Sequence, residues 1–471
     1  MSVHIDLRLS GGRVFLHGSG LVEADLLIKD GVLVGIVEPG TPVDATEDVD
    51  VAGQFVLPGA IDPHVHLGKD IRVPKDPDDA DLETASAAAG GVTSMLVYLM
   101  SADPYGEVFE KADRVMAEHA RVDYGYHFVL GTDQHLKELP AYVNDLGVST
   151  FKFFMNFRGD EGAYLGMPGN DDGFMYDLLG LAADNQAMIN PHPENIELVR
   201  RLQGRTFKDP DQPLRSWNAA RPPVVEADAQ QRVAYLAAAT GASVYAVHTS
   251  SGAALDVVRR QRESYPNLFV ETCTHYLTLS TESPCGTYGK VNPPLRDPED
   301  VEALWQGMAD GSVDTVGSDH NARHRSFKEK DIWTATAGFP GTGVLLPLTL
   351  SEGLRRGVPL SRLVDATSTR AAKLFGLYPR KGTIRVGSDA DLVVLDPEGG
   401  SVIDAQSQYS AAAYTPWQGE QVSPRIVHTL VRGTFALRDG RLTEARAGRF
   451  LPRPRSGATA LAAASEPEEQ S

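Results

Sequence analysis

Two histidines separated by one residue, His64 and His66, follow an apolar run over residues 55–61. If this run is a β-strand, alternation places both imidazoles on the same face near the end of the strand. Two imidazoles on one face are a common start to a divalent metal site. The pair alone does not establish such a site, because a buried histidine often only forms hydrogen bonds. Further ligands must come from elsewhere in the chain.

Four more side chains of ligand type lie in or directly after other apolar, strand-like segments. They are Lys152, His192, His248 and Asp319. Simpler explanations exist, since Asp319 could cap a following helix and Lys152 could face solvent. The apolar neighbours of Lys152 argue against solvent, because a buried amine without a partner is costly. Together with the histidine pair, these four residues predict a metal site.

Eight strand-like segments alternate with helical patterns through the middle of the chain. The strands are expected over 55–66, 92–100, 124–131, 150–157, 187–192, 243–249, 268–276 and 313–320, with helices over, for example, 107–121, 228–240 and 253–262. Eight β/α units over roughly 300 residues predict an α/β fold, a (β/α)₈ TIM barrel, with a doubly wound sheet as the alternative. Functional residues of such barrels occupy the C-terminal ends of the strands, where the six ligand candidates fall. Residues 205–227 hold four prolines and are expected to form a loop insertion.

Both ends of the chain show short apolar runs separated by turn signals such as Gly11-Gly12 and Asp439-Gly440. We therefore expect a small β-sandwich domain built from both chain ends. The predicted division is 1–56 for its N-terminal part, 57–375 for the barrel, 376–451 for its C-terminal part and 452–471 for a tail. The tail is rich in Ala, Ser, Pro and Glu and is expected to be disordered.

Composition excludes several classes of protein. The net charge of −19 and the lack of a basic block exclude nucleic acid as an expected partner. Two cysteines, Cys273 and Cys285, do not make a disulfide framework and suit a reducing cytoplasm. No signal peptide is recognised, and no apolar run approaches membrane-spanning length, so no membrane association is expected. We expect a cytoplasmic protein.

Several motifs make the chain, from about residue 5 to 445, resemble the amidohydrolase superfamily. They are PGAIDPHVH (58–66), FK (151–152), AVH (246–248), ETCTHYL (271–277), NPPLR (292–296), VGSDH (316–320) and KGTIRVGSDADL (381–392). The resemblance is to the cyclic-amidase branch of dihydropyrimidinase, D-hydantoinase, allantoinase and dihydroorotase. It implies a metal-dependent hydrolase that opens a cyclic amide or ureide ring such as a hydantoin, dihydropyrimidine or imide. It also implies a homo-oligomer, a tetramer or dimer, acting on a small molecule.

The resemblance also implies a cofactor arrangement. CO₂ would carboxylate Lys152, and the resulting carbamate would bridge two divalent ions, most readily Zn²⁺. One ion would be held by His64, His66 and Asp319, and the other by His192 and His248. A hydroxide bridging the ions would attack the amide carbonyl, with Asp319 as the catalytic residue that takes its proton and returns it to the leaving nitrogen.

The substrate-facing residues depart from these relatives. Hydantoinases and dihydropyrimidinases carry an oxyanion-donating tyrosine five residues after the bridging lysine, where this chain has Phe157. Phe157 has no hydroxyl, so either the donor is lost or Asn156, His275 or a water replaces it. Dihydroorotases carry an arginine where this chain has Gly68, which disfavours their activity. The expected substrate-binding residues are Asn156, Phe157, His275, Asn292, Arg296 and His324. His324 belongs to a basic segment after Asp319 that either contacts an acidic substrate or is merely solvated.

Other functions stay open at this point. They are allantoinase- or dihydroorotase-like activity, hydrolysis of an open-chain amide or carbamate, and a non-catalytic scaffold. The complete set of ligand candidates argues against the scaffold, because loss of metal ligands is its usual sequence mark.

Overall fold

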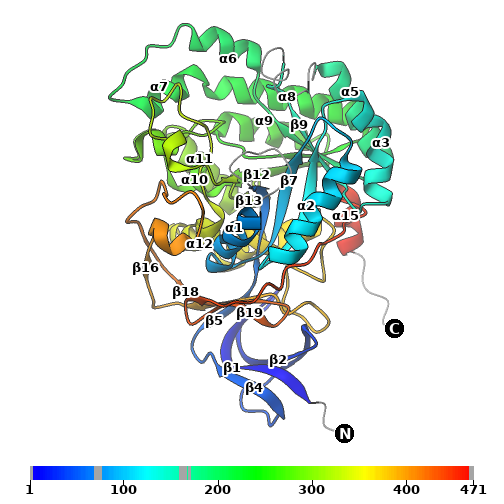
Figure 1. Ribbon diagram of the computed structural model, residues 1–471, viewed down its shortest axis with the longest axis vertical. Coiled ribbons are helices and arrows are strands. Elements are labelled where there is room, and N and C mark those ends of the chain that lie inside the picture. The colour runs from blue at the N-terminus through cyan, green and yellow to red at the C-terminus, as the bar shows by residue number, and fades with distance from the viewer. Residues whose placement is uncertain (1–3, 68–76, 159–166, 168–170, 466–471) are drawn as a thin grey trace.

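Residues 4–67, 77–158, 167 and 171–465 are described by the computed structural model, which contains two nine-stranded sheets (Figure 1). One of them is parallel, in the order β13-β12-β11-β10-β9-β8-β7-β6-β14. Its strands are β6 (Ala60–His66), β7 (Val92–Met100), β8 (Asp123–Val129), β9 (Thr150–Phe154), β10 (Met188–His192), β11 (Ser243–Ala246), β12 (Leu268–Cys273), β13 (Thr315–Gly317) and β14 (His320–Asn321).

The eighth barrel strand is split in two. β13 pairs with β12, while β14, three residues later, pairs with β6. Ser318 and Asp319 lie between the two pieces, and Asp319 has a φ of 47°. This pairing closes the sheet into a barrel and confirms the predicted (β/α)₈ fold. The expected continuous strand over 313–320 is wrong, because the backbone turns out of the extended region at Asp319.

Helices cover the outside of the barrel (Figure 1). They are α1 (Pro77–Ala89), α2 (Tyr105–His119), α3 (Asp133–Asn144), α5 (Asp172–Asp184), α6 (Ile196–Gln203), α7 (Pro213–Ala220), α8 (Pro223–Thr240), α9 (Gly252–Arg262), α10 (Thr274–Thr278), α11 (Pro298–Asp310), α12 (Leu345–Arg355), α13 (Leu360–Val364), α14 (Arg370–Leu374) and α15 (Gly457–Ser465). Their ends follow local chemistry. Helix α8 begins with Pro223 in its first turn and ends at Gly241, whose φ of 80° suits a residue without a Cβ.

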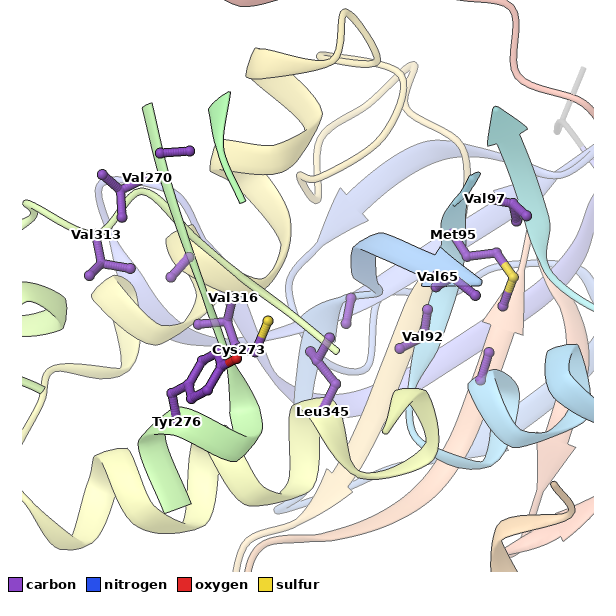
Figure 2. Packing of buried hydrophobic residues seen from close by; sticks show 14 of the residues in the cluster. Val65, Val92, Met95, Val97, Val270, Cys273, Tyr276, Val313, Val316 and Leu345 are labelled. Carbon is purple, nitrogen blue, oxygen red and sulfur yellow. The ribbon is translucent and has the colours of Figure 1, made fainter. Parts of the chain in front are cut away.

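Successive side chains of a barrel strand point to opposite faces of the sheet, so neighbouring residues belong to two different buried clusters. Val97 and Val270 belong to the cluster between the strands and the helices, which Figure 2 shows together with Val65 and Leu345. Their neighbours Leu96 and Phe269 belong to a second cluster with Phe375, which fills the barrel interior at its base. Because Val65 points outward, His64 and His66 on either side of it point inward.

The second nine-stranded sheet uses both ends of the chain. Its order is β20-β19-β18-β15-β5-β1-β2-β3, with β4 beside β1. Its strands are β1 (Ile5–Leu16), β2 (Gly20–Lys29), β3 (Val32–Val37), β4 (Ala45–Asp50), β5 (Phe55–Pro58), β15 (Leu392–Asp396), β18 (Arg425–Val431), β19 (Thr434–Arg438) and β20 (Arg441–Leu442); β16 (Ser401–Val402) and β17 (Gln421–Val422) pair separately. Leu7 and Leu26 share one buried cluster with Leu392 and Leu430. The small β domain from both chain ends is thus confirmed.

A buried ionic cluster lies where the two sheets meet. Nζ of Lys381 lies 2.5 Å from a carboxylate oxygen of Asp123, at the start of β8. It also lies 2.8 Å from Asp389 and 2.6 Å from Asp391, just before β15. Burial would lower the pKa of Lys381, but the three carboxylates outweigh burial and raise it. The cluster ties the barrel to the small domain.

The predicted loop insertion over 205–227 is wrong in part. The segment contains α7 and the start of α8. Pro213 and Pro223 each stand in the first turn of a helix, where a missing backbone N–H costs nothing because that donor has no intrahelical acceptor. The prolines therefore marked helix starts rather than a loop.

The expected disordered tail is also wrong over the described residues 452–465. The segment crosses the base of the barrel: the backbone N–H of Leu451 bonds to Tyr124, that of Arg453 to Gly147, and that of Ser456 to Gln186. Arg453 is fully buried, and its guanidinium donates to the carbonyl of Tyr126. Helix α15 follows. Long-range contacts, which composition does not reveal, hold this segment in place.

Within the described ranges, none of the helices combines the length and apolar character that crossing a bilayer requires.

Candidate metal centre

The structure brings all six predicted ligands to one cavity of about 160 Å³. His64 and His66 end β6, Lys152 lies on β9 and His192 is the last residue of β10. His248 follows β11 by two residues, and Asp319 lies between β13 and β14. These are the C-terminal ends of five barrel strands, where a (β/α)₈ barrel carries its chemistry.

His64, His66 and Asp319 form the tightest group. Nε2 of His64 lies 3.2 Å from Oδ1 of Asp319, and Nε2 of His66 lies 3.3 Å from the same oxygen. One ligand atom from each residue falls within 4.8 Å of the others. Burial would raise the pKa of Asp319, but the neighbouring histidines His64, His66 and His275 outweigh burial and lower it. The carboxylate therefore stays ionised, as a metal ligand must.

His192 and His248 form the second group. Their ring centroids lie 4.6 Å apart. Burial lowers the pKa of both rings, which keeps the imidazoles neutral. Among the described residues, neither ring nitrogen of His248 has a hydrogen-bond partner although the ring is buried. Buried polar atoms are rarely left unpaired, so these nitrogens fit a site that holds a cation.

Two of the predicted ligand residues share unusual backbone geometry. His248 has a φ of 41° and Asp319 a φ of 47°. Left-handed backbone at residues other than glycine is costly and clusters at functional sites. Each turn redirects a side chain into the cavity directly after its strand ends.

Lys152 is buried beside the two groups, with 1% of its surface exposed. Its Nζ lies 4.8 Å from the ring centre of Tyr98 and 5.1 Å from that of Phe154. Burial lowers its pKa to about 8, against the opposing pull of Asp319 and Glu271. More of this amine is therefore neutral at pH 7 than in an exposed lysine, and the neutral amine is the form that reacts with CO₂.

Two carboxylates behind the ligands were not predicted. Oε1 of Glu271 on β12 lies 2.8 Å from Nδ1 of His64. Oε2 of Glu194 lies 2.8 Å from Nε2 of His192 and accepts from Arg221 at 2.8 Å. Burial would raise the pKa of Glu194, but the charge of Arg221 and the hydrogen bond to His192 outweigh burial and hold it at about 2. The sequence signal was a lone glutamate within an apolar strand for Glu271 and a glutamate two residues after a ligand for Glu194.

Three of the six predicted substrate residues, Asn156, Phe157 and Asn292, line the cavity. The ring of Phe157 stacks on Phe154, with centroids 4.2 Å apart. Asn321, Ala337 and Gly338, which were not predicted, line it as well.

The other three predicted residues do not line the cavity. Arg296 is buried and bonds to Glu226 at 3.2 Å and to Ser250 at 2.9 Å, so its guanidinium stabilises the fold. His324 is exposed and bonds to Ser326. His275 is buried against Phe339, with ring centroids 5.1 Å apart. Gly68, where dihydroorotases carry an arginine, lies outside the described residues.

Comparison with known proteins agrees with this geometry. The profile of the Amidohydrolase family matches residues 280–436. The D-hydantoinase of Geobacillus stearothermophilus is 33% identical over 453 residues, covering 93% of this chain and 94% of that protein. The L-hydantoinase of Paenarthrobacter aurescens is 31% identical, covering 93% and 96%. The crystal structure of the dihydropyrimidinase from Brevibacillus agri superposes with a TM-score of 0.83 at 31% identity, covering 95% of this chain and 98% of that one. The chain therefore belongs to the amidohydrolase family, in the branch of the cyclic amidases.

Proposed function

We propose that this protein hydrolyses a C–N bond of a cyclic amide, ureide or imide and so opens the ring. The observation that carries the proposal is the convergence of six ligand-type side chains on one buried cavity. The hydantoinase and dihydropyrimidinase relatives support the same activity. They lend no support to an open-chain substrate or to a scaffold.

The residues present fit two divalent ions, which we propose to be Zn²⁺. One ion would be held by His64, His66 and Asp319, and the other by His192 and His248. Lys152 would bridge them as a carbamate, because an ammonium group has no lone pair to offer a metal. Such ions polarise a carbonyl oxygen and lower the pKa of bound water toward neutrality.

Asp319 would handle the proton. Its carboxylate lies beside His64 and His66 and stays ionised, so it can accept a proton from the attacking water. The same carboxyl group can then donate that proton to the ring nitrogen as the C–N bond breaks. The nitrogen then leaves as a neutral N–H group, which is ureido or amide in character when the ring is a ureide or imide.

The cavity walls favour an uncharged ring. Three asparagine side chains, those of Asn156, Asn292 and Asn321, line it and can bond to the carbonyl and N–H groups of a ureide. Phe154 and Phe157 provide an apolar side. Among the described lining residues, Lys152 is the only cationic side chain. A carboxylate-bearing ring such as dihydroorotate therefore finds no arginine among them.

We also propose that the protein is a homo-oligomer, a tetramer or dimer, in the cytoplasm. Kinship with the hydantoinases supports the oligomer. The two free cysteines support the cytoplasm, which is a reducing compartment. The apolar stretch over 344–350 does not provide a subunit contact, because Val344 and Leu350 are buried within the chain itself. Light scattering at micromolar concentration tests the proposal, and a monomer mass would refute it.

Ring opening of a substrate panel tests the main proposal. The panel holds dihydrouracil, hydantoin, 5-substituted hydantoins, allantoin, dihydroorotate and simple imides, with metal content measured in parallel. We expect turnover of an uncharged ring and about two divalent ions per chain. Lys152→Ala should lose metal and activity together, whereas Lys137→Ala, at an exposed position, should lose neither. A Lys152→Ala variant that kept both would refute the assignment.

A further inference from the structure

One wall of the cavity consists of two loop segments rather than barrel strands. Val291 and Asn292 belong to the segment before α11, and Ala337 and Gly338 to the segment after the 3₁₀ turn Arg325–Phe327. The two segments are joined directly, since the backbone N–H of Gly338 donates to the carbonyl of residue 290 at 3.0 Å. Loops are more mobile than strands, so the distance of this wall from the ligands depends on what holds it.

The side chain of Lys328 donates hydrogen bonds to both segments. It is fully buried. Nζ donates to the carbonyl oxygens of Lys290 at 2.9 Å, Thr336 at 2.9 Å and Gly338 at 3.0 Å. These three bonds use every donor of an ammonium group. One of the acceptors, Gly338, is itself a wall residue.

Lys290 precedes Val291 in the first segment, and its side chain donates hydrogen bonds to the second segment. Its side chain is also buried, and Nζ donates to the carbonyl oxygens of Ala335 at 2.6 Å and Trp333 at 3.4 Å. Nζ also lies 4.1 Å from the ring centre of Trp217 on α7. The two ammonium groups together bind five carbonyl oxygens of the two segments, one of them on the wall residue Gly338.

Trp217 completes the support at Asn292. Its Nε1 donates to the carbonyl of Val291 and to Oδ1 of Asn292, both at 3.1 Å. This bond occupies the amide oxygen of Asn292 and leaves its N–H₂ group for the cavity. The orientation of Asn292 thus depends on the ring that stacks with Lys290.

Stability alone does not account for two buried ammonium groups. Burying a charge is costly, and apolar side chains of similar volume are often as stabilising. Burial lowers the pKa of Lys290 to about 8, which reflects that cost. Each ammonium group instead fixes the relative positions of the backbone carbonyl groups that it binds, because a compact cation attracts several of them to one point.

We propose that Lys290 and Lys328 are positioning residues that fix the wall formed by Val291, Asn292, Ala337 and Gly338 and so set how tightly the substrate ring binds. Neither lysine lines the cavity, so both act through the backbone and do not touch the substrate. The proposal rests on the ring-opening function proposed above.

Substitution of each lysine by methionine tests this, since methionine keeps the apolar stem and removes the donors. For Lys328→Met and Lys290→Met we expect KM to rise about 10-fold, with kcat little changed. Hydrogen–deuterium exchange over residues 333–339 should accelerate while bound metal stays at the wild-type level. Lys330→Met, at an exposed lysine of the same loop, should change none of these quantities.

The proposal would be overturned if hydrogen–deuterium exchange over residues 333–339 did not change in the variants. It would also be overturned if that exchange became faster while KM stayed the same. A joint loss of kcat and metal would also overturn it, because that result means general disruption. If Lys328→Met does not fold, Trp217→Phe keeps the ring beside Lys290, removes the bond to Asn292, and should raise KM in the same way. If the wild-type protein opens no ring, the proposed function fails, whereas exchange over 333–339 in the lysine variants still decides whether the wall is held as described.

Discussion

The side chains of Glu271 and His64 are hydrogen-bonded, with Oε1 of Glu271 2.8 Å from Nδ1 of His64. The same oxygen accepts the backbone N–H of His248 at 3.0 Å. One buried carboxylate thus orients a ligand from each proposed metal position. Such outer carboxylates fix the tautomer and raise the basicity of a ligating histidine.

Glu271→Gln should therefore weaken metal binding. The amide keeps the size of the side chain but removes the charge, and we expect a loss of about 10- to 100-fold in metal affinity. Metal titration after chelation and dialysis measures this. Glu263→Gln, at an exposed glutamate, is the matched control. Equal metal affinity in both variants would show that Glu271 does not act on the ligands.

Phe157→Tyr tests how the site stabilises the developing oxyanion. Phe157 packs on Phe154 within a buried cluster that includes Met100 and Met167. A hydroxyl buried there without a partner costs about 1–3 kcal/mol, so we expect kcat/KM for the best cyclic amide to fall. A single oxyanion donor is worth about 10²–10³ in rate. A large gain in hydantoin turnover would instead identify an enzyme that merely lacks its donor.

Arg296→Ala should destabilise the fold without emptying the metal site. It would leave the fully buried Glu226 without its ion-pair partner, which costs about 3–5 kcal/mol of unfolding free energy. Denaturant unfolding measures this loss. Arg355→Ala, at an exposed ion pair, should change stability by less than about 1 kcal/mol. If Arg296→Ala kept its stability but lost substrate affinity, Arg296 would be a binding residue after all.

The cluster around Lys381 predicts a stability change at high pH. Its pKa is raised above the ordinary value of 10.5, so the stability it contributes is fully present below pH 10.5 and is lost as pH rises through the raised pKa. Unfolding free energies of wild type and Lys381→Met should therefore differ most below pH 10.5 and converge above it. A difference that stays constant across this range would contradict the assignment.

Sequence reasoning brought the candidate residues to one place because parallel strands end at the same edge of a barrel. The spacing of His64 and His66, and the apolar runs before Lys152 and His192, were enough to place those four residues. The left-handed turns at His248 and Asp319 carry no such signal, and the strand expected through Asp319 was consequently too long.

The remaining errors concern contacts between distant parts of the chain. Arg296 was predicted to face the substrate because it ends a recognised motif, but its partner Glu226 lies 70 residues away in sequence. Arg453 stood in a segment with the composition of a disordered tail, yet it is buried beneath the barrel. Neither periodicity nor composition reports such pairings.

The backbone bonds of Leu451, Arg453 and Ser456 across the barrel base have a consequence for the order of synthesis. Ribosomes produce a chain from its N-terminus, so all eight barrel strands leave the ribosome before these three residues do. The backbone groups of Tyr124, Gly147 and Gln186 that receive them stay exposed until then. Every nascent chain thus passes through a stage in which all residues of the candidate metal centre have been synthesised while these backbone groups at the barrel base still lack their partners.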